Sequence, residues 1–373
     1  MYAIMRTLKY AWLALLLVPG LTIAQASVVR AATLSNSQEP GSVLVFPYFQ
    51  TGTVILFSNL PEPKTEIHIG VTCPTGVTCP ELLPVKLHAD WVCPGSENPS
   101  SSFVCKESDF ILFTTINGKI TLSPNGPNVP PCKHGYLVVY VVNLFDQPIK
   151  FDGLFGDAVV RGGAGGTAVS AYNAIPIQAA NPAPGATGSL ITTGIDPHTG
   201  QATLIFDGLG NDYALVTGQL TGDVKFDNTT KPPLFNETRL ILLTLDVQSN
   251  FPNNPTFVDF VFYNADQRPT STGTNFVCWQ ERDITAFNAG LTLASQGTKE
   301  GSFVSDQATK IQLQGISDGS GPATLLGLIL TTEGPSTQAD ERSYITAPYN
   351  NSIGVPTTFA LDSAPPPPET SAH

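Results

Sequence analysis

The apolar segments of this chain are short, closely spaced and separated by turn-forming residues, and this pattern constrains the fold most. They recur at intervals of roughly 8–12 residues, a spacing typical of strands in all-β proteins. The 33 glycines and 32 prolines supply turns between them, and helical periodicity does not persist past about ten residues. We therefore predict an all-β, mostly antiparallel fold with two domains that resemble β-sandwiches or irregular barrels.

Two segments alternate between apolar and polar residues, as strands with one buried face do. In Thr65–Val71 and Val85–Val92 the apolar side chains share one face. The opposite faces carry Glu66 and His68 in the first segment and His88 and Asp90 in the second. Three other segments are almost wholly apolar and are predicted to be covered on both faces. These are Tyr136–Phe145, Leu240–Val247 and Leu325–Leu330.

Asn117-Gly118 is a turn signal, because a two-residue type I′ turn requires positive φ at both central residues. It predicts a hairpin over Ile111–Leu122 in which Phe113 opposes Leu122. That register would place the apolar residues of both arms on one face.

The first 26 residues have the order of a secretory signal peptide: positive charge, apolar run, small residues. Arg6 and Lys9 precede the apolar run Tyr10–Val18, and Ala24-Gln25-Ala26 follows. The run is too short to span a bilayer, which takes about 20 residues. We predict cleavage after residue 26, with Ala31-Ala32 as the alternative site. The mature protein is predicted to have no membrane span and to be secreted or located in the periplasm or cell envelope.

The glycine-rich run at Arg161–Thr167 is the predicted boundary between the two domains, because four of its seven residues are glycine and such runs are flexible or tightly turned. The predicted organisation is a signal peptide (1–26), a flexible N-terminal segment (27–40), a cysteine-containing β domain (41–161), a second β domain (168–362) and a disordered proline-rich tail (363–373).

The six cysteines all follow the signal peptide and contain no C-x-x-C pair. In an exported chain this favours disulfides over a zinc site. Cys73 and Cys79 flank a short turn and are the first predicted pair. Six cysteines permit 15 pairings. For the remaining four we predict the pairs Cys93–Cys105 and Cys132–Cys278, the second of which would tie the cysteine-rich part to the later half.

The formal net charge of −12 argues against two classes of partner. Lysine and arginine are sparse and unclustered, so the chain has no electrostatic footprint for nucleic acid or anionic lipid. The scattered acidic residues are read as a source of solubility.

Two motifs associated with catalysis or cofactors occur in unsuitable surroundings. Gly315–Gly319 fits G-x-S-x-G, whose serine in α/β-hydrolases lies on a strand-to-helix turn. No helical pattern follows Ser317, and the only later histidine is His373, so we predict a hairpin turn. Gly163–Ala168 fits a loose dinucleotide-binding loop, but that loop must open a helix. We predict a linker there, no catalytic residue and no cofactor.

Asp207-Gly208-Leu209-Gly210-Asn211-Asp212 resembles one turn of a calcium-binding β-roll. Calcium takes 6–8 oxygen ligands, more than one such turn supplies. Asp207, Asn211 and Asp212 are the calcium candidates, and an equivalent loop that holds Asp152 and Asp157 would add ligands. The alternative is a turn between strands.

Two further groups of side chains would matter only if the fold brought them together. Glu66, His68, His88 and Asp90 would form a metal or acid–base cluster if their strands were neighbours. Glu281 and Asp283 would suit a glycoside hydrolase only across a suitable cleft. Exposed aromatics on one sheet face would suit carbohydrate binding. The candidates are Phe257, Tyr263 and Trp279, although Trp91 and Trp279 are more typical of a core.

Several stretches resemble a group of uncharacterised secreted bacterial β-rich proteins with no assigned activity. The resemblance rests on GSVLVFP at Gly41–Pro47, WVCPG at Trp91–Gly95, FVCKESDF at Phe103–Phe110 and AYNAIPIQA at Ala171–Ala179. It implies a bacterial exported protein and carries no mechanism.

Together these patterns predict a secreted, non-catalytic β-sandwich protein with a structural, surface or ligand-binding role. Its partner would be an extracellular glycan or protein, engaged through loops that a rigid scaffold positions. Two alternatives remain open at this point: a secreted polysaccharide-active hydrolase or lyase, and a non-catalytic carbohydrate-binding protein.

Overall fold

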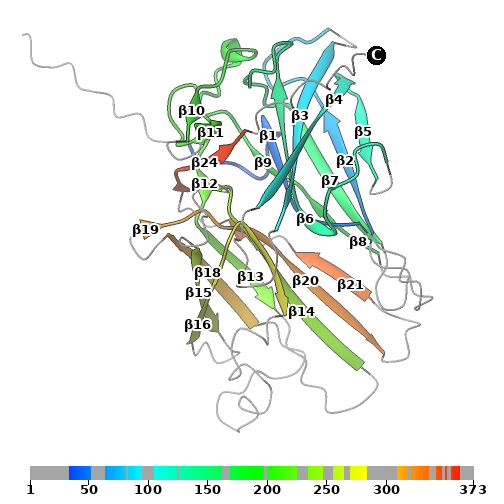
Figure 1. Cartoon of the computed structure of the whole chain (residues 1–373), viewed down its shortest axis with the longest axis vertical. Helices are drawn as coiled ribbons and strands as arrows, with labels where there is room; N and C mark the ends of the chain where they lie inside the picture. Colours follow the sequence, from blue (N-terminus) through cyan, green and yellow to red (C-terminus); the bar gives the residue numbers. More distant parts are fainter. Residues whose placement is uncertain are drawn as a thin grey trace, which may run out of the picture. The chain divides into compact units, whose positions relative to one another are not determined.

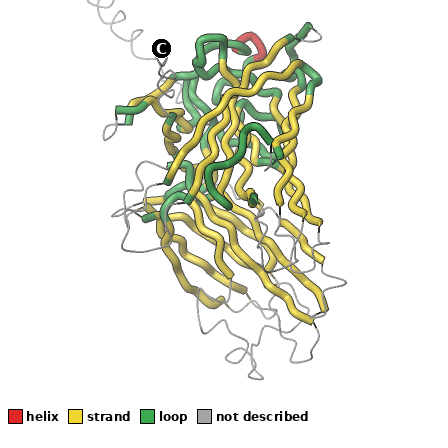
Figure 2. The backbone as a smooth tube through the Cα atoms, turned by 45° about the vertical axis from the view of Figure 1, so that its right-hand side comes forward, coloured by secondary structure: helices red, strands yellow, loops and turns green. Residues whose placement is uncertain are grey.

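The structure is a computed structural model of the chain. It describes residues 33–51, 64–80, 83–94, 105–123, 126–161, 169–196, 200–224, 234–246, 255–263, 269–283, 309–317, 321–335, 342–346, 349–350 and 354–361. This part of the chain consists of strands and loops with one short 3-10 turn, η1 (Pro184–Ala186) (Figure 2). The strands form small antiparallel sheets, so the predicted all-β, mostly antiparallel class is confirmed.

Residues 43–177 supply two of the sheets (Figure 1). The five-stranded sheet contains, in spatial order, β4 (Lys106–Thr115), β3 (Pro84–Cys93), β6 (His134–Val142), β1 (Val43–Gln50) and β9 (Ile175–Ile177). The four-stranded sheet contains β5 (Lys119–Leu122), β2 (Lys64–Val71), β7 (Leu154–Arg161) and β8 (Val169–Asn173).

The later residues supply four more sheets. Two are small: β10 (Thr193–Ile195), β11 (Ala202–Phe206) and β24 (Thr357–Ala360), and the pair β12 (Val216–Thr217) and β23 (Gly354–Val355). The third contains β16 (Pro269–Phe276), β15 (Thr256–Tyr263), β18 (Thr309–Ser317), β13 (Gln219–Val224) and β22 (Tyr349–Asn350), with β19 (Gly321–Pro322) paired to β18. The fourth contains β17 (Trp279–Asp283), β14 (Leu234–Leu243), β20 (Leu326–Pro335) and β21 (Arg342–Thr346).

The five-stranded and four-stranded sheets of residues 43–177 share one apolar core. The predicted inward faces are confirmed: Ile67, Ile69 and Val71 of β2 and Val85, Leu87, Ala89 and Trp91 of β3 are all buried. A Cβ on Gly156 of β7 would collide with the Phe46 ring of β1. Glycine at this position therefore lets the two sheets approach closely.

The predicted division into two separate sandwich domains is wrong, because residues 32–373 form a single compact unit. Strands β8 and β9 follow the predicted boundary in sequence, yet β8 pairs with β7 and β9 pairs with β1. Of the glycine-rich run, residues 162–167 lie outside the described residues, as do the signal peptide and the tail. Within the segment 27–40, predicted to be flexible, Thr33 and Ser35 donate backbone hydrogen bonds to Gly208 and Leu215.

Residues 240–243 of β14 and 326–330 of β20 are buried on both faces, as the apolar sequence predicts. In β14, Ile241 and Leu243 belong to the same core as the first two sheets, whereas Leu240 and Leu242 belong to a second core. The strand β20 alternates in the same way. This sheet therefore contributes side chains to both cores.

The hairpin predicted at Asn117-Gly118 is wrong, since β4 and β5 lie in different sheets. Asn117 has the positive φ of a turn residue, 60°. However, its amide donates to the Val71 carbonyl oxygen of β2, and Gly118 accepts from the Val71 amide. The turn is a corner that carries the chain from one sheet to the next. Phe113 consequently points to solvent with 67% exposure, while Leu122 is buried.

The apolar segment Tyr136–Phe145 is only partly a strand. Residues 136–142 are buried on both faces, as predicted. The strand ends at Val142, and a turn follows in which Leu144 is 81% and Phe145 83% exposed. A strand extending to Phe145 is therefore corrected to a strand with an exposed apolar turn after it.

Three disulfides use all six cysteines, and the described residues contain no free cysteine. The predicted Cys73–Cys79 bridge is confirmed. The other two predicted pairs are wrong, because the structure has Cys93–Cys132 and Cys105–Cys278.

The register of β3 and β4 explains this correction. Cys93 lies opposite Lys106, so the neighbouring residue Cys105 points to the other face of the sheet. It meets Cys278 from the later half there, while Cys93 meets Cys132. Cys278 therefore does link the cysteine-rich part to the later half, as predicted, but its partner is Cys105 and not Cys132.

Removing the long bridge should destabilise the protein most. The Cys105→Ser/Cys278→Ser variant should lose about 5 kcal/mol of unfolding free energy, because this disulfide spans 173 residues and long loops lose more entropy on closure. The Cys73→Ser/Cys79→Ser variant removes a bridge spanning 6 residues and should lose about 2 kcal/mol. Urea unfolding of both variants beside the wild type measures the losses, and equal losses would contradict the loop-closure account.

Candidate functional site

The polar face of β3 holds His88 between two carboxylates. Its Nε2 lies 3.4 Å from Oδ1 of Asp90 and 3.6 Å from Oδ2 of Asp109 on β4. The imidazole stacks on the Tyr140 ring of β6, with ring centroids 5.0 Å apart. The register explains the meeting, because β3 pairs His88 with Tyr140 on one side and Asp90 with Asp109 on the other.

This cluster favours a charged histidine. Burial opposes protonation, but the nearby carboxylates of Asp90, Asp109 and Asp146 together raise the pKa of His88. Burial also raises the pKa of Tyr140 well above its ordinary value, and the charge of Asp90 adds to that increase. A histidine with a raised pKa keeps its proton, and so its positive charge between the carboxylates, to a higher pH than a free imidazole does.

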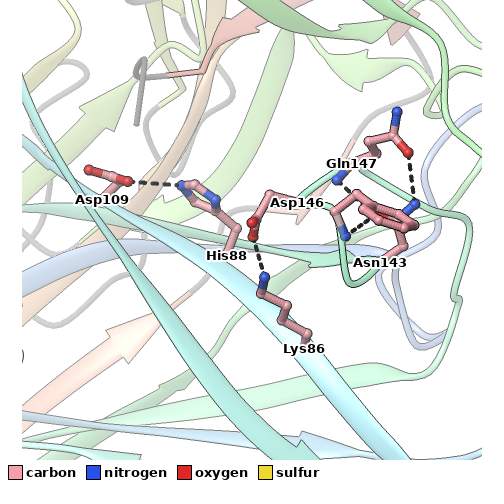
Figure 3. A network of polar contacts seen from close by, with 7 residues as sticks. Lys86, His88, Asp109, Asn143, Asp146 and Gln147 are labelled. Carbon is pink, nitrogen blue, oxygen red and sulfur yellow. Dashed lines mark hydrogen bonds and ion pairs between the residues drawn. The ribbon is translucent and has the colours of Figure 1, made fainter. Parts of the chain in front are cut away.

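A second ion pair joins β3 to the turn after β6 (Figure 3). Nζ of Lys86 lies 2.6 Å from Oδ1 of Asp146. Within this turn, Oδ1 of Asn143 accepts hydrogen bonds from the amides of Phe145 and Gln147 at 2.8 and 3.1 Å. Nδ2 of Asn143 donates to Oε1 of Gln147 at 2.9 Å. The turn is thus stabilised by the hydrogen bonds of Asn143 within it and by the ion pair with Lys86 of β3.

The polar face of β2 holds the second predicted histidine. Nε2 of His68 lies 2.7 Å from Oε1 of Glu66, and its Nδ1 lies 2.9 Å from Oδ2 of Asp157 on β7. Each ring nitrogen therefore points to a different carboxylate. This geometry fixes the ring in place. Because the two carboxylates lie on opposite sides of the imidazole, the three side chains do not converge on one point where a metal ion would bind.

The structure does not bring the four predicted residues together. Glu66 and His68 lie on β2 and His88 and Asp90 on β3, in different sheets. Among the described residues, no group of three or more histidine, cysteine, aspartate or glutamate side chains is arranged to hold a metal ion. Each pair instead forms ion pairs within its own sheet.

Trp279, a predicted carbohydrate-binding candidate, is buried at the start of β17. Its Nε1 donates to the Pro47 carbonyl oxygen at 2.9 Å. The rings of Tyr48 and His134 stack with it at centroid distances of 6.5 and 5.1 Å. Trp91 is buried as well. Of the other candidates, Phe257 is 39% exposed and Tyr263 is half-buried.

The carboxylate pair suggested for a glycosidase, Glu281 and Asp283, lies on β17. Oε1 of Glu281 accepts a hydrogen bond from Nη1 of Arg239 at 3.1 Å. The side chain of Asp283 lies outside the described residues. Glu281 thus joins β17 to β14 through an ion pair.

The calcium candidates lie in the loop between β11 and β12. Oδ1 of Asp207 accepts from the Leu209 amide at 2.8 Å, and Gly208 and Gly210 have positive φ, as in a tight turn. Burial raises the pKa of Asp212, and its interaction with Asp207 raises it further. No equivalent loop is formed by Asp152 and Asp157, because Asp152 accepts hydrogen bonds from Ser42 and the Ala179 amide while Asp157 binds His68. Calcium binding stays a prediction for Asp207, Asn211 and Asp212.

The serine of the G-x-S-x-G motif ends a strand. Ser317 is the last residue of β18 and pairs with Gly321 of β19 in antiparallel fashion. This pairing agrees with the predicted hairpin, whose turn residues 318–320 lie outside the described residues. The loop at Gly163–Ala168 and the residue His373 lie outside the described residues.

Sequence reasoning missed the partners of both histidines. Asp109 and Asp157 reach His88 and His68 across strand pairs, 21 and 89 residues away in the chain. The alternating pattern identified the polar faces, but no local signal indicates which strands become neighbours. The turn at 143–147 carried a signal, since Asn143, Asp146 and Gln147 interrupt an apolar run.

Comparisons with known proteins assign no family. No family model and no curated protein matches the sequence. Among solved structures, the chain is similar to the viral chemokine binding protein R17 encoded by rodent gammaherpesvirus Peru, with 10% sequence identity and a TM-score of 0.17. That alignment covers 85% of this chain and 87% of the viral one. A similarity this low carries no argument. The described part of the chain contains no helix with the length and hydropathy of a membrane span.

The raised pKa of His88 predicts a pH-dependent stability. A histidine whose pKa rises on folding contributes stability that is complete below its ordinary value of 6.5 and is lost as the pH rises through the raised value. The wild type should therefore have a higher unfolding free energy than the His88→Gln variant. The difference should be largest below pH 6.5 and should shrink toward alkaline pH. Urea unfolding across a pH series measures it.

The control for this experiment is Asp109→Asn, which removes one of the charges that raise the pKa of His88. It should reduce the pH dependence without abolishing it, because Asp90 remains. A difference between wild type and His88→Gln that stays constant or grows with pH would contradict the assignment.

Proposed function

We propose that this protein is an extracytoplasmic, non-catalytic binding protein that engages a partner through the turn at residues 143–147. The observation that carries the proposal is the exposure of Leu144 and Phe145, at 81% and 83%, in a turn whose backbone is held by hydrogen bonds. Large apolar side chains exposed in adjacent positions are a common mark of an interaction site.

The turn is preorganised. Asn143 accepts two backbone amides within it, and the Lys86–Asp146 ion pair ties it to β3. A partner that binds Leu144 and Phe145 would therefore lose little conformational entropy from this segment. Preorganised aromatic and aliphatic anchors supply much of the binding energy in protein interfaces.

A third exposed apolar side chain lies close to the turn. Nζ of Lys86 is 6.0 Å from the centroid of the Phe113 ring, and the same Nζ binds Asp146 of the turn. Phe113 is 67% exposed. We call Phe113, Leu144 and Phe145 the apolar tip. Burying such side chains is worth about 1.5–3 kcal/mol each, so a complementary pocket would bind the tip favourably.

The extracytoplasmic setting is supported by the disulfides. All six cysteines are paired, and such bridges form and persist in oxidising compartments. Secretion through the predicted signal peptide is part of the proposal, because residues 1–26 lie outside the described residues.

The alternative of a polysaccharide-active hydrolase or lyase loses one of the two groups that motivated it. It needed either His68, His88 and Asp90 in one cleft or Glu281 and Asp283 against a distant partner, and the two histidines lie on different sheets, each in its own ion pairs. A non-catalytic role is the simpler proposal for side chains that connect strands.

Photo-crosslinking tests the role of the turn. With p-benzoylphenylalanine in place of Phe145, the exported protein should form discrete adducts with a partner from the extracellular or envelope fraction of the cells that produce it. Unlabelled wild type should suppress these adducts, whereas the Leu144→Ser/Phe145→Ser variant should not, because it lacks the anchors. The unfolding free energy of that variant should stay within about 0.5 kcal/mol of wild type, as for other exposed substitutions.

The matched control is the same photoreactive residue at Ile195, which is 73% exposed on β10. Adducts that are identical from positions 145 and 195, or that the Leu144→Ser/Phe145→Ser variant suppresses as well as the wild type does, would contradict the proposal.

A further inference from the structure

The outward face of the four-stranded sheet carries an aromatic ring beside a glycine of the neighbouring strand. Phe155 of β7 pairs with Gly70 of β2. A Cβ on Gly70 would collide with the outer carbons of the Phe155 ring, so the glycine allows the ring to lie over the neighbouring strand. Phe155 remains 53% exposed. The sheet thus presents a partly exposed aromatic side chain to solvent beside polar residues.

Polar groups held in fixed positions adjoin this ring. Asp157 follows two residues later on the same strand and face, and His68 lies opposite it on β2. The hydrogen bonds of His68 to Asp157 and Glu66 hold all three side chains in place. The carboxylate side chains are 47% and 40% exposed. A carboxylate accepts about four hydrogen bonds, so each retains acceptor capacity toward solvent.

The neighbouring strands extend the polar surface on both sides. Asn173 of β8 pairs with Asp157, and Thr121 of β5 pairs with His68. Both are exposed. Residues two apart on a strand are about 7 Å apart, and residues in direct register across strands are about 5 Å apart. The ring and its polar neighbours therefore cover an area that one or two sugar rings would fill.

These features select one class of ligand. A sugar has an apolar face of C–H groups that packs on an aromatic ring and a rim of hydroxyls that donate to carboxylates and accept from amides. Two carboxylates beside the ring and a net charge of −12 disfavour an anionic ligand. The divergent nitrogens of His68 disfavour a metal ion, as shown above.

We propose that this surface, formed by Phe155, Asp157, His68 and Glu66 and named the Phe155 face, binds a neutral polysaccharide. It is separate from the apolar tip, since it lies on the other sheet. One aromatic ring and a few hydrogen bonds without a deep pocket correspond to a weak site, with a dissociation constant on the order of 1 mM for a short oligosaccharide. A long polymer would bind more tightly because it presents many copies of its repeat.

Native affinity electrophoresis tests the proposal. The full disulfide-bonded protein is run in gels that contain a soluble β-glucan, an α-glucan, a galactomannan or a xylan. At least one polysaccharide should retard the wild type. Phe155→Ala should lower the affinity by about tenfold or more, because it removes the platform. Phe155→Trp should increase the retardation, and Asp157→Asn should reduce it severalfold.

The control is Phe113→Ala, an exposed phenylalanine on the other sheet, which should leave the retardation unchanged. The Leu144→Ser/Phe145→Ser variant should also be retarded like the wild type, so a failure of the apolar tip does not imply a failure of this site. Circular dichroism melting of each variant identifies any that do not fold, and Asp157→Asn and Phe155→Trp keep the test decisive if Phe155→Ala unfolds.

Two outcomes would overturn the proposal. Wild type that none of the four polysaccharides retards would show that the Phe155 ring only covers Gly70 and stabilises the strand pair. Retardation that is equal in wild type, Phe155→Ala and Phe155→Trp, with all three folded, would place polysaccharide binding elsewhere on the protein.

Discussion

The burial of residues 240–243 of β14 and 326–330 of β20 on both faces is the constraint on which the rest of the fold depends. A strand covered on both faces cannot be stable with only one of its neighbours, because each buried leucine or isoleucine contributes about 1.5–3 kcal/mol. Ile241 and Leu243 need the core of the first two sheets, and Leu240 and Leu242 need the second core. The contacts at the edge of this sheet follow from that arrangement. Trp279 and Cys278 stand where the sheet meets the first half, and they add a hydrogen bond, ring stacking and a disulfide.

The polar faces of β2 and β3 show how similar sequences acquire different roles from what covers them. Each strand carries a histidine two residues from a carboxylate. On β3, Asp90 is 1% exposed, and a buried charge requires a partner, so His88 and Asp109 complete a cluster within the protein. On β2, the carboxylates around His68 remain partly exposed, and the neighbouring Phe155 ring is open to solvent. The first arrangement stabilises the fold, and the second leaves groups that are able to bind a ligand.

The errors of prediction arise where a local signal competes with a distant partner. Asn117-Gly118 does form a turn with positive φ at Asn117. However, the Asn117 amide and the Gly118 carbonyl oxygen form hydrogen bonds with Val71 of β2, so the chain passes from one sheet to the other there. The disulfides follow the same rule. Cys73–Cys79 depends on a short turn and was predictable, whereas Cys105–Cys278 depends on the side of β4 that faces the later half. The glycine-rich run suggested a domain boundary, yet β7 and β8 on either side of it pair with each other.

The sequence by itself determined that this protein is built from antiparallel strands, which faces of β2 and β3 are apolar, and that residues 136–142 and 240–243 are buried on both sides. These properties follow from the period of the pattern along one strand, which is a local quantity. Only the tertiary structure decided which strands are neighbours, which cysteines meet, and that His68 and His88 serve different sheets. The physical reason is that strand pairing joins residues far apart in the chain. The free energy of pairing depends on the burial of whole sheet faces, and the sequence of one strand contributes too little of it to indicate which strand is its neighbour.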